Sequence, residues 1–460
     1  MSELSYKFGS CKEGDMMQNA RGQKEKGRTK REREKRIFYF FSPILHFPHF
    51  SLSLFPLLFF VSFFLLLFFS GDALAIKKTR EEIEASKRCV LCHNQISPGV
   101  VNDWEKSNHA KAQVTCVDCH QADSTDADAR RHEGEIISAI VSPRDCSRCH
   151  PKQVMEFNES LHSKAVSFVQ NLEGDRAGDD ALAYKVEGKA AAIMGCEKCH
   201  GTIVKVKNGI FDKDTWPNNG IGRVNPDGSK GSCTACHTRH LFSIAESRKP
   251  ETCGTCHMGP DHPQYEIYME SKHGVIYSSE KEKWNMDIAA SAWDTRHFRA
   301  PTCATCHMSG IGGLEPTHNV SDRLSWELEW PLSEKTNDWK GKRERMQMVC
   351  LSCHSKNWVE GYYQQFDNVI TLYNEEYYKP IKKEMDELYK LGYLTKDKFD
   401  EEIEFEFFEY WHHEGRRARM GASMMGPDYT QWHGFYELAK RRLELKNEIR
   451  EIMEKKGKGK

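Results

Sequence analysis

One five-residue motif occurs eight times in this chain and constrains its fold more than any other feature. Sixteen of the 17 cysteines lie in CxxCH pentads, each with a histidine directly after the second cysteine. Numbered first to eighth along the chain, the motifs are Cys89, Cys92 and His93; Cys116, Cys119 and His120; Cys146, Cys149 and His150; Cys196, Cys199 and His200; Cys233, Cys236 and His237; Cys253, Cys256 and His257; Cys303, Cys306 and His307; and Cys350, Cys353 and His354.

This motif is typical of covalently attached haem c. The two thiols add across the vinyl groups of the porphyrin, and the adjacent histidine binds the iron as its proximal ligand. Zinc knuckles or a ladder of disulfides are the alternatives, but neither requires a histidine directly after every second cysteine. The sequence therefore predicts eight covalently bound haem c groups.

So many haems in so short a chain leave little room for an ordinary apolar core. We expect a mainly α multihaem cytochrome c with a haem-filled core and few strands. Residues 356–460 contain no CxxCH, and their apolar residues recur at helical spacing, which predicts a C-terminal helical bundle. The predicted domains are a leader over residues 1–75, an octahaem domain over 76–355 and a helical domain over 356–460.

The N-terminus has the features of an export signal. Basic residues cluster at 30–36, an apolar run covers Leu57 to Phe69, and Ala73-Leu74-Ala75 forms a small-x-small cleavage site. An uncleaved anchor is the alternative. No later segment is apolar enough to cross a membrane, and the near-neutral charge gives no indication of nucleic-acid binding. We expect an exported protein, in the periplasm or an equivalent compartment.

Histidines outside the motifs are candidates for the distal ligands of the irons. Three share a local pattern, with an aromatic residue five positions before the histidine and a serine two positions before it: His109, His162 and His273. Four further candidates lack this pattern: His132, His240, His297 and His318. An iron with two histidine ligands carries electrons, whereas an iron with an open position can do chemistry.

The eight motifs, the segment "CHMGPDHPQ" and the later segment "GPDYTQWHGFYE" together resemble the octahaem hydroxylamine oxidoreductases, which include hydrazine dehydrogenases of anaerobic ammonium oxidisers. The resemblance covers residues 80 to about 445. It implies that the haem of Cys196, Cys199 and His200 is catalytic and open on its distal side. It also implies that Asp261 and His262 lie over that side, and that the porphyrin is crosslinked to Tyr429 of a neighbouring subunit, with Tyr436 as the alternative.

The same resemblance implies a homotrimer, a soluble cytochrome c-type electron acceptor and, in an anaerobic ammonium oxidiser, the anammoxosome lumen. The expected activity is oxidation of hydroxylamine to nitric oxide or nitrite. Residues 308–349 contain no tyrosine, whereas family members that make nitrite carry one between the last two haems, so nitric oxide or dinitrogen is the favoured product. Hydrazine oxidation to dinitrogen, a reductive enzyme and an electron conduit remain alternatives.

Overall fold

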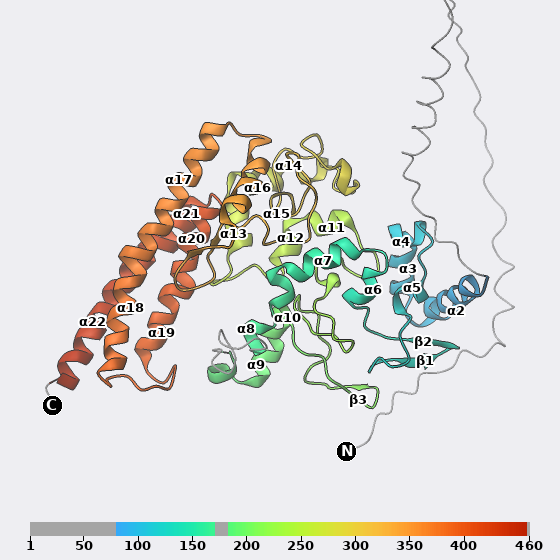
Figure 1. Ribbon diagram of the computed structural model, residues 1–460, viewed down its shortest axis with the longest axis horizontal. Helices are drawn as coiled ribbons and strands as arrows, with labels where there is room; N and C mark the ends of the chain where they lie inside the picture. Colours follow the sequence, from blue (N-terminus) through green and yellow to red (C-terminus); the bar gives the residue numbers. More distant parts are fainter. Residues whose placement is uncertain (1–79, 171–182, 458–460) are drawn as a thin grey trace, which may run out of the picture. The chain divides into compact units, whose positions relative to one another are not determined.

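The computed structural model of the protein describes residues 80–170 and 183–457. Short helices and long loops make up the part of the chain that carries the CxxCH motifs (Figure 1). Its helices are α2 (Arg80–Ile96), α3 (Pro98–Lys106), α4 (Asn108–Lys111), α5 (Cys116–His120), α6 (Pro143–Ser147), α7 (Pro151–Glu159), η2 (Leu161–Lys164), α8 (Ser167–Gln170), η4 (Ala183–Glu187), α9 (Lys189–Met194), α10 (Cys196–His200), η5 (Cys233–Ala235), α11 (Ile244–Arg248), α12 (Pro250–Gly254), α13 (Gln264–Glu270), α14 (Lys272–Glu280), η6 (Lys281–Lys283), η7 (Ala290–Ala292), α15 (Cys303–His307) and α16 (Trp339–Leu351).

Strands are few and short within the described residues. They form three two-stranded antiparallel ladders: β1 (Arg130–His132) with β2 (Glu135–Ile137), β3 (Val206–Lys207) with β4 (Ile210–Phe211), and β5 (Trp326–Glu327) with β6 (Glu334–Lys335). The predicted mainly α fold with few strands is confirmed. The predicted leader lies outside the described residues.

Longer helices follow the eighth motif. They are α17 (Lys356–Leu372), η8 (Tyr373–Tyr378), α18 (Lys379–Lys390), α19 (Glu402–Glu409), η9 (Tyr410–Glu414), α20 (Gly415–Ser423), α21 (Pro427–Thr430), η10 (Gln431–Tyr436) and α22 (Glu437–Gly457). The segments η8, η9 and η10 are π-helical turns set within otherwise α-helical runs. One such turn, η9, carries His412.

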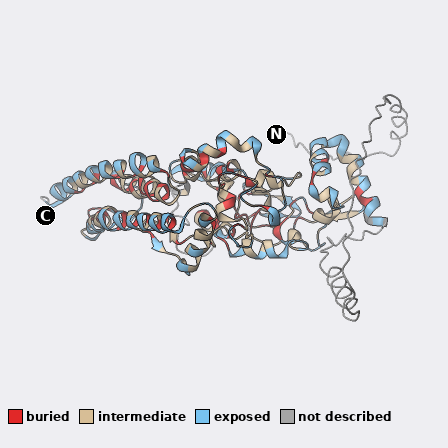
Figure 2. Ribbon diagram, turned by 90° about the horizontal axis from the view of Figure 1, so that it is seen from above, coloured by how far each residue is buried: buried red, intermediate tan, exposed pale blue. Residues whose placement is uncertain are grey.

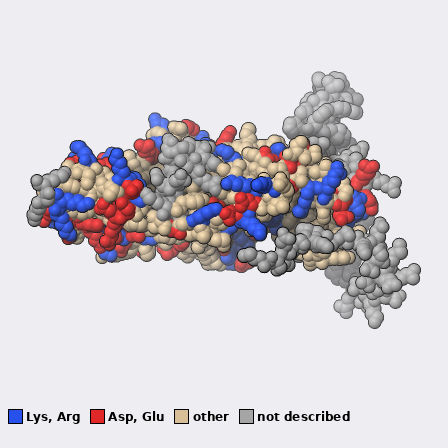
Figure 3. All heavy atoms as spheres, turned by 90° about the horizontal axis from the view of Figure 1, so that it is seen from below, with Lys and Arg blue, Asp and Glu red and all other residues tan. Residues whose placement is uncertain are grey.

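The apolar core of this helical region is conventional. Buried residues form a stripe along each long helix (Figure 2), and α18, α19 and α22 pack on one another through Ile381, Leu388, Ile403 and Leu445. Acidic and basic side chains lie side by side over the same helices (Figure 3), with ion pairs one helical turn apart such as Lys382 with Asp386. Each helix is therefore amphipathic, as its spacing of apolar residues predicts.

The packing has no break near residue 355. Residues 79–460 form one compact unit. Helix α13 from the motif-bearing part contacts α20, and Ile267 of α13 is buried against Met420. The predicted division of roles between residues 76–355 and 356–460 stays a prediction. Within the described residues, no helix is long and apolar enough to span a bilayer.

Candidate functional site

Seven of the eight proximal histidines face a second imidazole at nearly constant spacing. The ring centroids are 6.0 to 6.4 Å apart in every pair. The pairs are His93 with His132, His150 with His109, His120 with His240, His257 with His162, His237 with His318, His354 with His273, and His200 with His262.

This spacing fits an iron held between two imidazoles. Such an iron separates the ring centroids by about 6 Å, since each metal–nitrogen bond is about 2 Å and each ring adds about 1 Å. Burial lowers the pKa of His200 and of His237 to about 4, so both rings are neutral, the form that binds a metal. The sixteen motif cysteines are thiols and not disulfides, which is the form that adds to the vinyl groups of haem.

The recurring aromatic–serine–histidine pattern has a local structural cause. In each copy a helix ends at the serine, whose backbone is extended, and a new helix begins directly after it. The histidine is the second residue of this new helix: His109 in α4, His162 in η2 and His273 in α14. The Ser107 and Ser271 side chains cap their helices by accepting from the backbone N–H of Ala110 and Gly274. The break at the serine lets the chain turn and present the ring.

A tightly packed loop holds the fourth motif in place. The N–H of Ile221 donates to the carbonyl of Cys199 over 2.9 Å, and the N–H of Gly222 donates to that of His200 over 3.2 Å. Gly201 has φ of +91°, and a Cβ there would lie 2.4 Å from the backbone nitrogen of Arg223. Only glycine allows this approach. The His200 Nδ1 also lies 3.3 Å from the carbonyl oxygen of Ala165, which fixes the plane of its ring.

The Asp261–His262 pair faces the fourth motif across the space that a haem would fill. The ring centroids of His200 and His262 are 6.2 Å apart. The Nδ1 of His262 and the Oδ2 of Asp261 are 2.6 Å apart. The structure thus brings His200, the His262 imidazole and the Asp261 carboxylate together at one motif.

Two cationic or polar groups from the C-terminal helices surround Asp261. The Arg416 Nη1 and the His412 Nε2 each lie 3.9 Å from Asp261 Oδ2. Burial acts to raise the pKa of Asp261, but the hydrogen bond from His262 and the positive charge of Arg416 outweigh it and hold that pKa well below its usual value. The carboxylate is therefore ionised at neutral pH.

His412 is a site residue that the sequence did not single out. Its ring stacks on Phe408 with a centroid distance of 4.2 Å, and its Nδ1 is buried without a hydrogen-bond partner. Burial lowers its pKa, so the ring is neutral. The "HHEGRR" run around it could be identified as an amphipathic helix, but nothing in the sequence indicates that the first of these histidines reaches a loop some 150 residues earlier.

Two glycines allow the segment that carries Tyr429 to pack closely against α20 and α13. A Cβ at Gly421 would lie 2.6 Å from the backbone nitrogen of Thr430, and one at Gly426 would lie 2.7 Å from the side chain of Ile267. Burial, followed by the charges of Glu266 and Glu270 on α13, raises the pKa of Tyr429. The "GPDYTQWHG" stretch therefore fixes Tyr429 on its own subunit, and its predicted link to a neighbour's haem stays a prediction.

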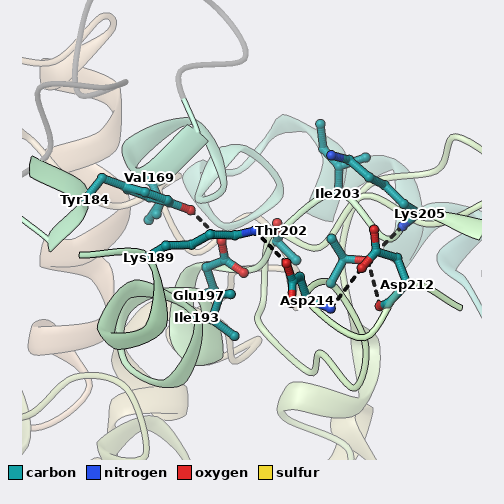
Figure 4. Close-up of a pocket in the computed structure, with 11 residues that line it drawn as sticks. Val169, Tyr184, Lys189, Ile193, Glu197, Thr202, Ile203, Lys205, Asp212 and Asp214 are labelled. Atoms are coloured by element: carbon teal, nitrogen blue, oxygen red, sulfur yellow. Dashed lines mark hydrogen bonds and ion pairs between the residues drawn. The ribbon is translucent and has the colours of Figure 1, made fainter.

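A polar cavity of about 330 Å³ adjoins the fourth motif (Figure 4). Glu197, the residue after Cys196, lines it and accepts a hydrogen bond from Tyr184. Across the cavity, Lys189 and Asp214 form an ion pair of 2.5 Å. Lys205 and Asp212 line the cavity as well, and Glu197 is the residue through which it adjoins α10, the helix of the fourth motif.

Contacts between cysteines of different motifs give the order in which the motifs neighbour one another. The thiols of Cys89 and Cys116, of Cys146 and Cys233, of Cys199 and Cys256, and of Cys253 and Cys303 lie close enough to shift each other's pKa. Weaker effects of the same kind relate Cys119 to Cys146, Cys236 to Cys253, and Cys306 to Cys350. Within the described residues the motifs thus run one, two, three, five, six, seven and eight, with the fourth motif branching from the sixth.

The remaining distal candidate, His297, is not brought opposite a proximal histidine. Its ring stacks on Trp293 at 6.3 Å and lies 3.9 Å from Asp294. In the described part of the chain, no imidazole faces His307 at the spacing of the other pairs. The role of His297 as a ligand stays a prediction.

Comparison with known proteins matches the chain to a family defined by repeated CxxCH motifs. A family model described as "Seven times multi-haem cytochrome CxxCH" matches residues 112–401. That range contains seven of the eight motifs, and the first motif precedes it. The match covers well over half of the chain.

The chain is also similar to individual proteins. A "Probable nitrite reductase-hydroxylamine oxidoreductase fusion protein" of Kuenenia stuttgartiensis is 28% identical over 337 residues, which make up 61% of this chain and 35% of that protein. The chain thus spans about a third of this relative's length. A solved structure named "Hypothetical multiheme protein" superposes with a TM-score of 0.72 at 26% identity, over 81% of this chain and 96% of that one. A Kuenenia stuttgartiensis "reducing HAO-like protein complex" shares the fold, with a TM-score of 0.62 at 21% identity over 82% and 87% of the two chains.

Proposed function

Because the chain belongs to the multihaem cytochromes with repeated CxxCH motifs, we propose that it is an octahaem redox enzyme that oxidises hydroxylamine at its fourth motif. Its c-type haems are bound covalently through the CxxCH motifs. The bound haem at Cys196, Cys199 and His200 would supply redox chemistry at an exchangeable distal position. The other haems would carry electrons.

The observation that supports this proposal best is the Asp261–His262 pair on the distal side of His200. Oxidation of hydroxylamine to nitric oxide releases protons and electrons in equal number. An imidazole that is hydrogen-bonded to an ionised carboxylate can accept such protons near neutral pH. His262 is the first acceptor, and Asp261 holds its ring and stabilises the imidazolium that results.

The order in which the motifs lie next to one another would provide a route for electrons away from the fourth haem. The fourth motif meets the sixth through Cys199 and Cys256, and the sixth pairs His257 with His162. From there the order runs toward the eighth motif in one direction and the first in the other. A soluble cytochrome c-type acceptor would take the electrons from the surface.

The proposed oxidative direction depends on Tyr429. A phenol linked covalently to the porphyrin distorts the macrocycle and favours oxidation in the family that the chain resembles. Tyr429 would be donated by a neighbouring subunit, which requires an oligomer, and a homotrimer is the expected state. The chain would act after export, in a periplasm or in an anammoxosome lumen.

Two further activities fit the same site. Hydrazine oxidation to dinitrogen needs the same proton acceptors. A reductive reaction has its own support, because the Kuenenia stuttgartiensis relative is named for both a nitrite reductase and a hydroxylamine oxidoreductase. An electron conduit is the remaining alternative.

Steady-state turnover of the haem-loaded protein with hydroxylamine and with hydrazine, with gas analysis of the products, tests the proposal. We expect hydroxylamine consumption coupled to reduction of an added cytochrome c, with nitric oxide as product. Dinitrogen from hydrazine at a higher kcat/KM would favour the second candidate. Absence of turnover with both substrates, together with reduction of nitrite, would contradict the oxidative assignment.

Replacing Tyr429 with phenylalanine tests the crosslink. We expect the variant to lose the absorption band on the red side of the reduced Soret band that a modified haem produces. Tyr436→Phe is the matched control, because Tyr436 lies two helical turns away and is half exposed. Persistence of the band in Tyr429→Phe would show that another residue forms the link.

A further inference from the structure

We propose that His262 binds the distal face of the fourth haem in the substrate-free protein and leaves it when a small ligand enters, as a reversible cap. The inference concerns the same site as the proposed function and rests on it for the identity of the incoming substrate. It does not depend on the direction of the reaction.

The position of the His262 ring is the first argument. Its centroid lies 6.2 Å from that of His200. The six other pairs span 6.0 to 6.4 Å. A histidine that only accepted protons from a bound substrate would stand farther away, because the substrate's nitrogen atom would occupy the space between iron and ring. The distal side of the fourth motif is as narrow as that of a motif with two histidine ligands.

The hydrogen bond on the other ring nitrogen is the second argument. Histidines that bind metals usually donate their second N–H to a carboxylate or a carbonyl. Proximal histidines of this chain follow that rule: His120 Nδ1 lies 2.9 Å from the carbonyl of Ser138, and His93 Nδ1 lies 2.8 Å from Ser97 Oγ. The 2.6 Å contact between His262 Nδ1 and Asp261 likewise leaves the Nε2 of His262 for the iron.

The attachment of His262 shows why this cap can open. His109, His162 and His273 lie in the first turn of a helix that holds them. His262 lies between α12 and α13, in a loop, and Gly259 in that loop has a φ of +91°. The His262 ring is thus held by a loop that carries a glycine with a positive φ, whereas the first turn of a helix fixes the backbone of these three histidines.

Asp261 keeps its own partners when His262 moves. Arg416 donates to the Asp261 carbonyl over 3.4 Å, and Arg417 donates to the Pro260 carbonyl over 3.1 Å. His412 lies 3.9 Å from the Asp261 carboxylate, and its buried Nδ1 has no partner. The carboxylate therefore stays fixed between α20 and the cap, and a displaced His262 remains tethered within reach of the substrate.

The exchange would replace one ligand of the iron with another and would transfer no electrons. The bond between His262 Nε2 and the iron breaks, and the incoming nitrogen compound takes the vacated position. The freed Nε2 then becomes the proton acceptor that the proposed function requires. One residue would thus serve both as the resting cap and as the base.

The experiment counts high-spin haems by electron paramagnetic resonance in the oxidised, haem-loaded protein. His262→Ala should add one high-spin haem relative to wild type, and added imidazole should remove it again. Its cyanide affinity should rise by about 10- to 1000-fold, since a capped state leaves only about 0.1–10% of the molecules open. His413→Ala, which removes a neighbouring imidazole that faces no motif, should change neither quantity.

An unchanged high-spin count in His262→Ala would overturn the proposal. A second test avoids this variant: in wild type the rate of cyanide binding should level off at high cyanide, because departure of the cap becomes limiting. A rate that rises in proportion to cyanide at all concentrations would overturn it equally. Turnover measurements separate the two proposals. If the protein consumes hydroxylamine but His262→Ala does not change the spin state, the cap is contradicted and the proposed function is not. If the spin state changes but the protein turns over neither substrate, the proposed function is contradicted and the cap is not.

Discussion

Asp261 is the residue on which the chemistry of the site depends most. Its carboxylate is ionised, because the hydrogen bond from His262 and the charge of Arg416 lower its pKa. This charge orients the His262 ring and stabilises its protonated form. Arg416 remains charged as well, although burial lowers its pKa to about 10.

Asp261→Asn should therefore reduce kcat far more than it changes KM. We expect a loss of about 10²- to 10⁴-fold, the usual contribution of a positioned acid–base group. Because the pKa of Asp261 is well below its usual value, the carboxylate itself stays ionised when the pH is lowered to about 5. Asp386→Asn, at an exposed ion pair on α18, is the control. A kcat within about threefold of wild type for Asp261→Asn, on the scale of that expected loss, would exclude a catalytic role.

At the level of single residues, the sequence alone identified most of this site. The eight motifs and the histidines that lie opposite six of them could be named as candidates from the sequence, and the Asp261–His262 pair from resemblance, but which histidine faces which motif could not. His412 and Arg416 could not, because their role depends on the contact of a C-terminal helix with a distant loop. The distance between the His200 and His262 rings could not be predicted from the sequence either, because it depends on how two distant segments pack together.

At the level of secondary structure, short helices explain how histidines are positioned opposite the motifs in a region with a small apolar core. The helix–serine–helix unit recurs at three motifs and places its histidine in the first turn of the second helix. The sequence reveals the recurrence. The structure shows that each unit consists of two helices, because the serine is extended and interrupts the first one.

Ser271→Ala should destabilise its helix more than Ser160→Ala does. The Ser271 side chain caps α14, whereas Ser160 makes no cap bond and only donates to the Phe157 carbonyl. Loss of a cap costs about 1 kcal/mol. Thermal unfolding of the two haem-loaded variants provides the comparison, and equal shifts in Tm would show that the cap bond contributes nothing.

Asp367 joins three elements and should make stability depend on acid. It accepts hydrogen bonds from Arg343 of α16 and from Trp326 of β5, and it pairs with Lys335 of β6. Burial acts to raise the pKa of Asp367, but these bonds and charges lower it to about 2. The stabilisation is thus complete above the unfolded pKa of about 4 and is lost as the pH falls through about 2.

Asp367→Asn should cost about 2 kcal/mol at pH 7, because it removes the counter-charge of the nearly buried Arg343. The difference in Tm from wild type should shrink as the pH is lowered toward about 2, where wild type loses the same charge. A difference that stays constant over this range would show that the charge of Asp367 does not stabilise the fold.

Across the whole molecule, the order of the motifs determines which haems the electrons reach first. The fourth motif branches from the sixth, and the first motif is four steps beyond the sixth along the remaining order. The sequence gives the number of motifs but not this branching, because the order in space departs from the order in the chain at the fourth motif.

Changing a distal ligand near the branch should therefore slow the outflow of electrons most. His162→Ala alters the sixth motif, and a rise in its potential of about 120 mV would make the next transfer about 100-fold less favourable. His132→Ala alters the first motif and should leave the early steps unchanged. Stopped-flow reduction by hydroxylamine compares the two, and equal slowing would contradict the order.

The most direct measurement is a cyanide titration of the oxidised, haem-loaded protein, followed by magnetic circular dichroism. The account predicts that the haem at the fourth motif binds cyanide, and that Asp261→Asn and His262→Ala alter its affinity while His413→Ala does not. Binding by none of the haems, or an affinity that none of these substitutions changes, would contradict a substrate site at the fourth motif.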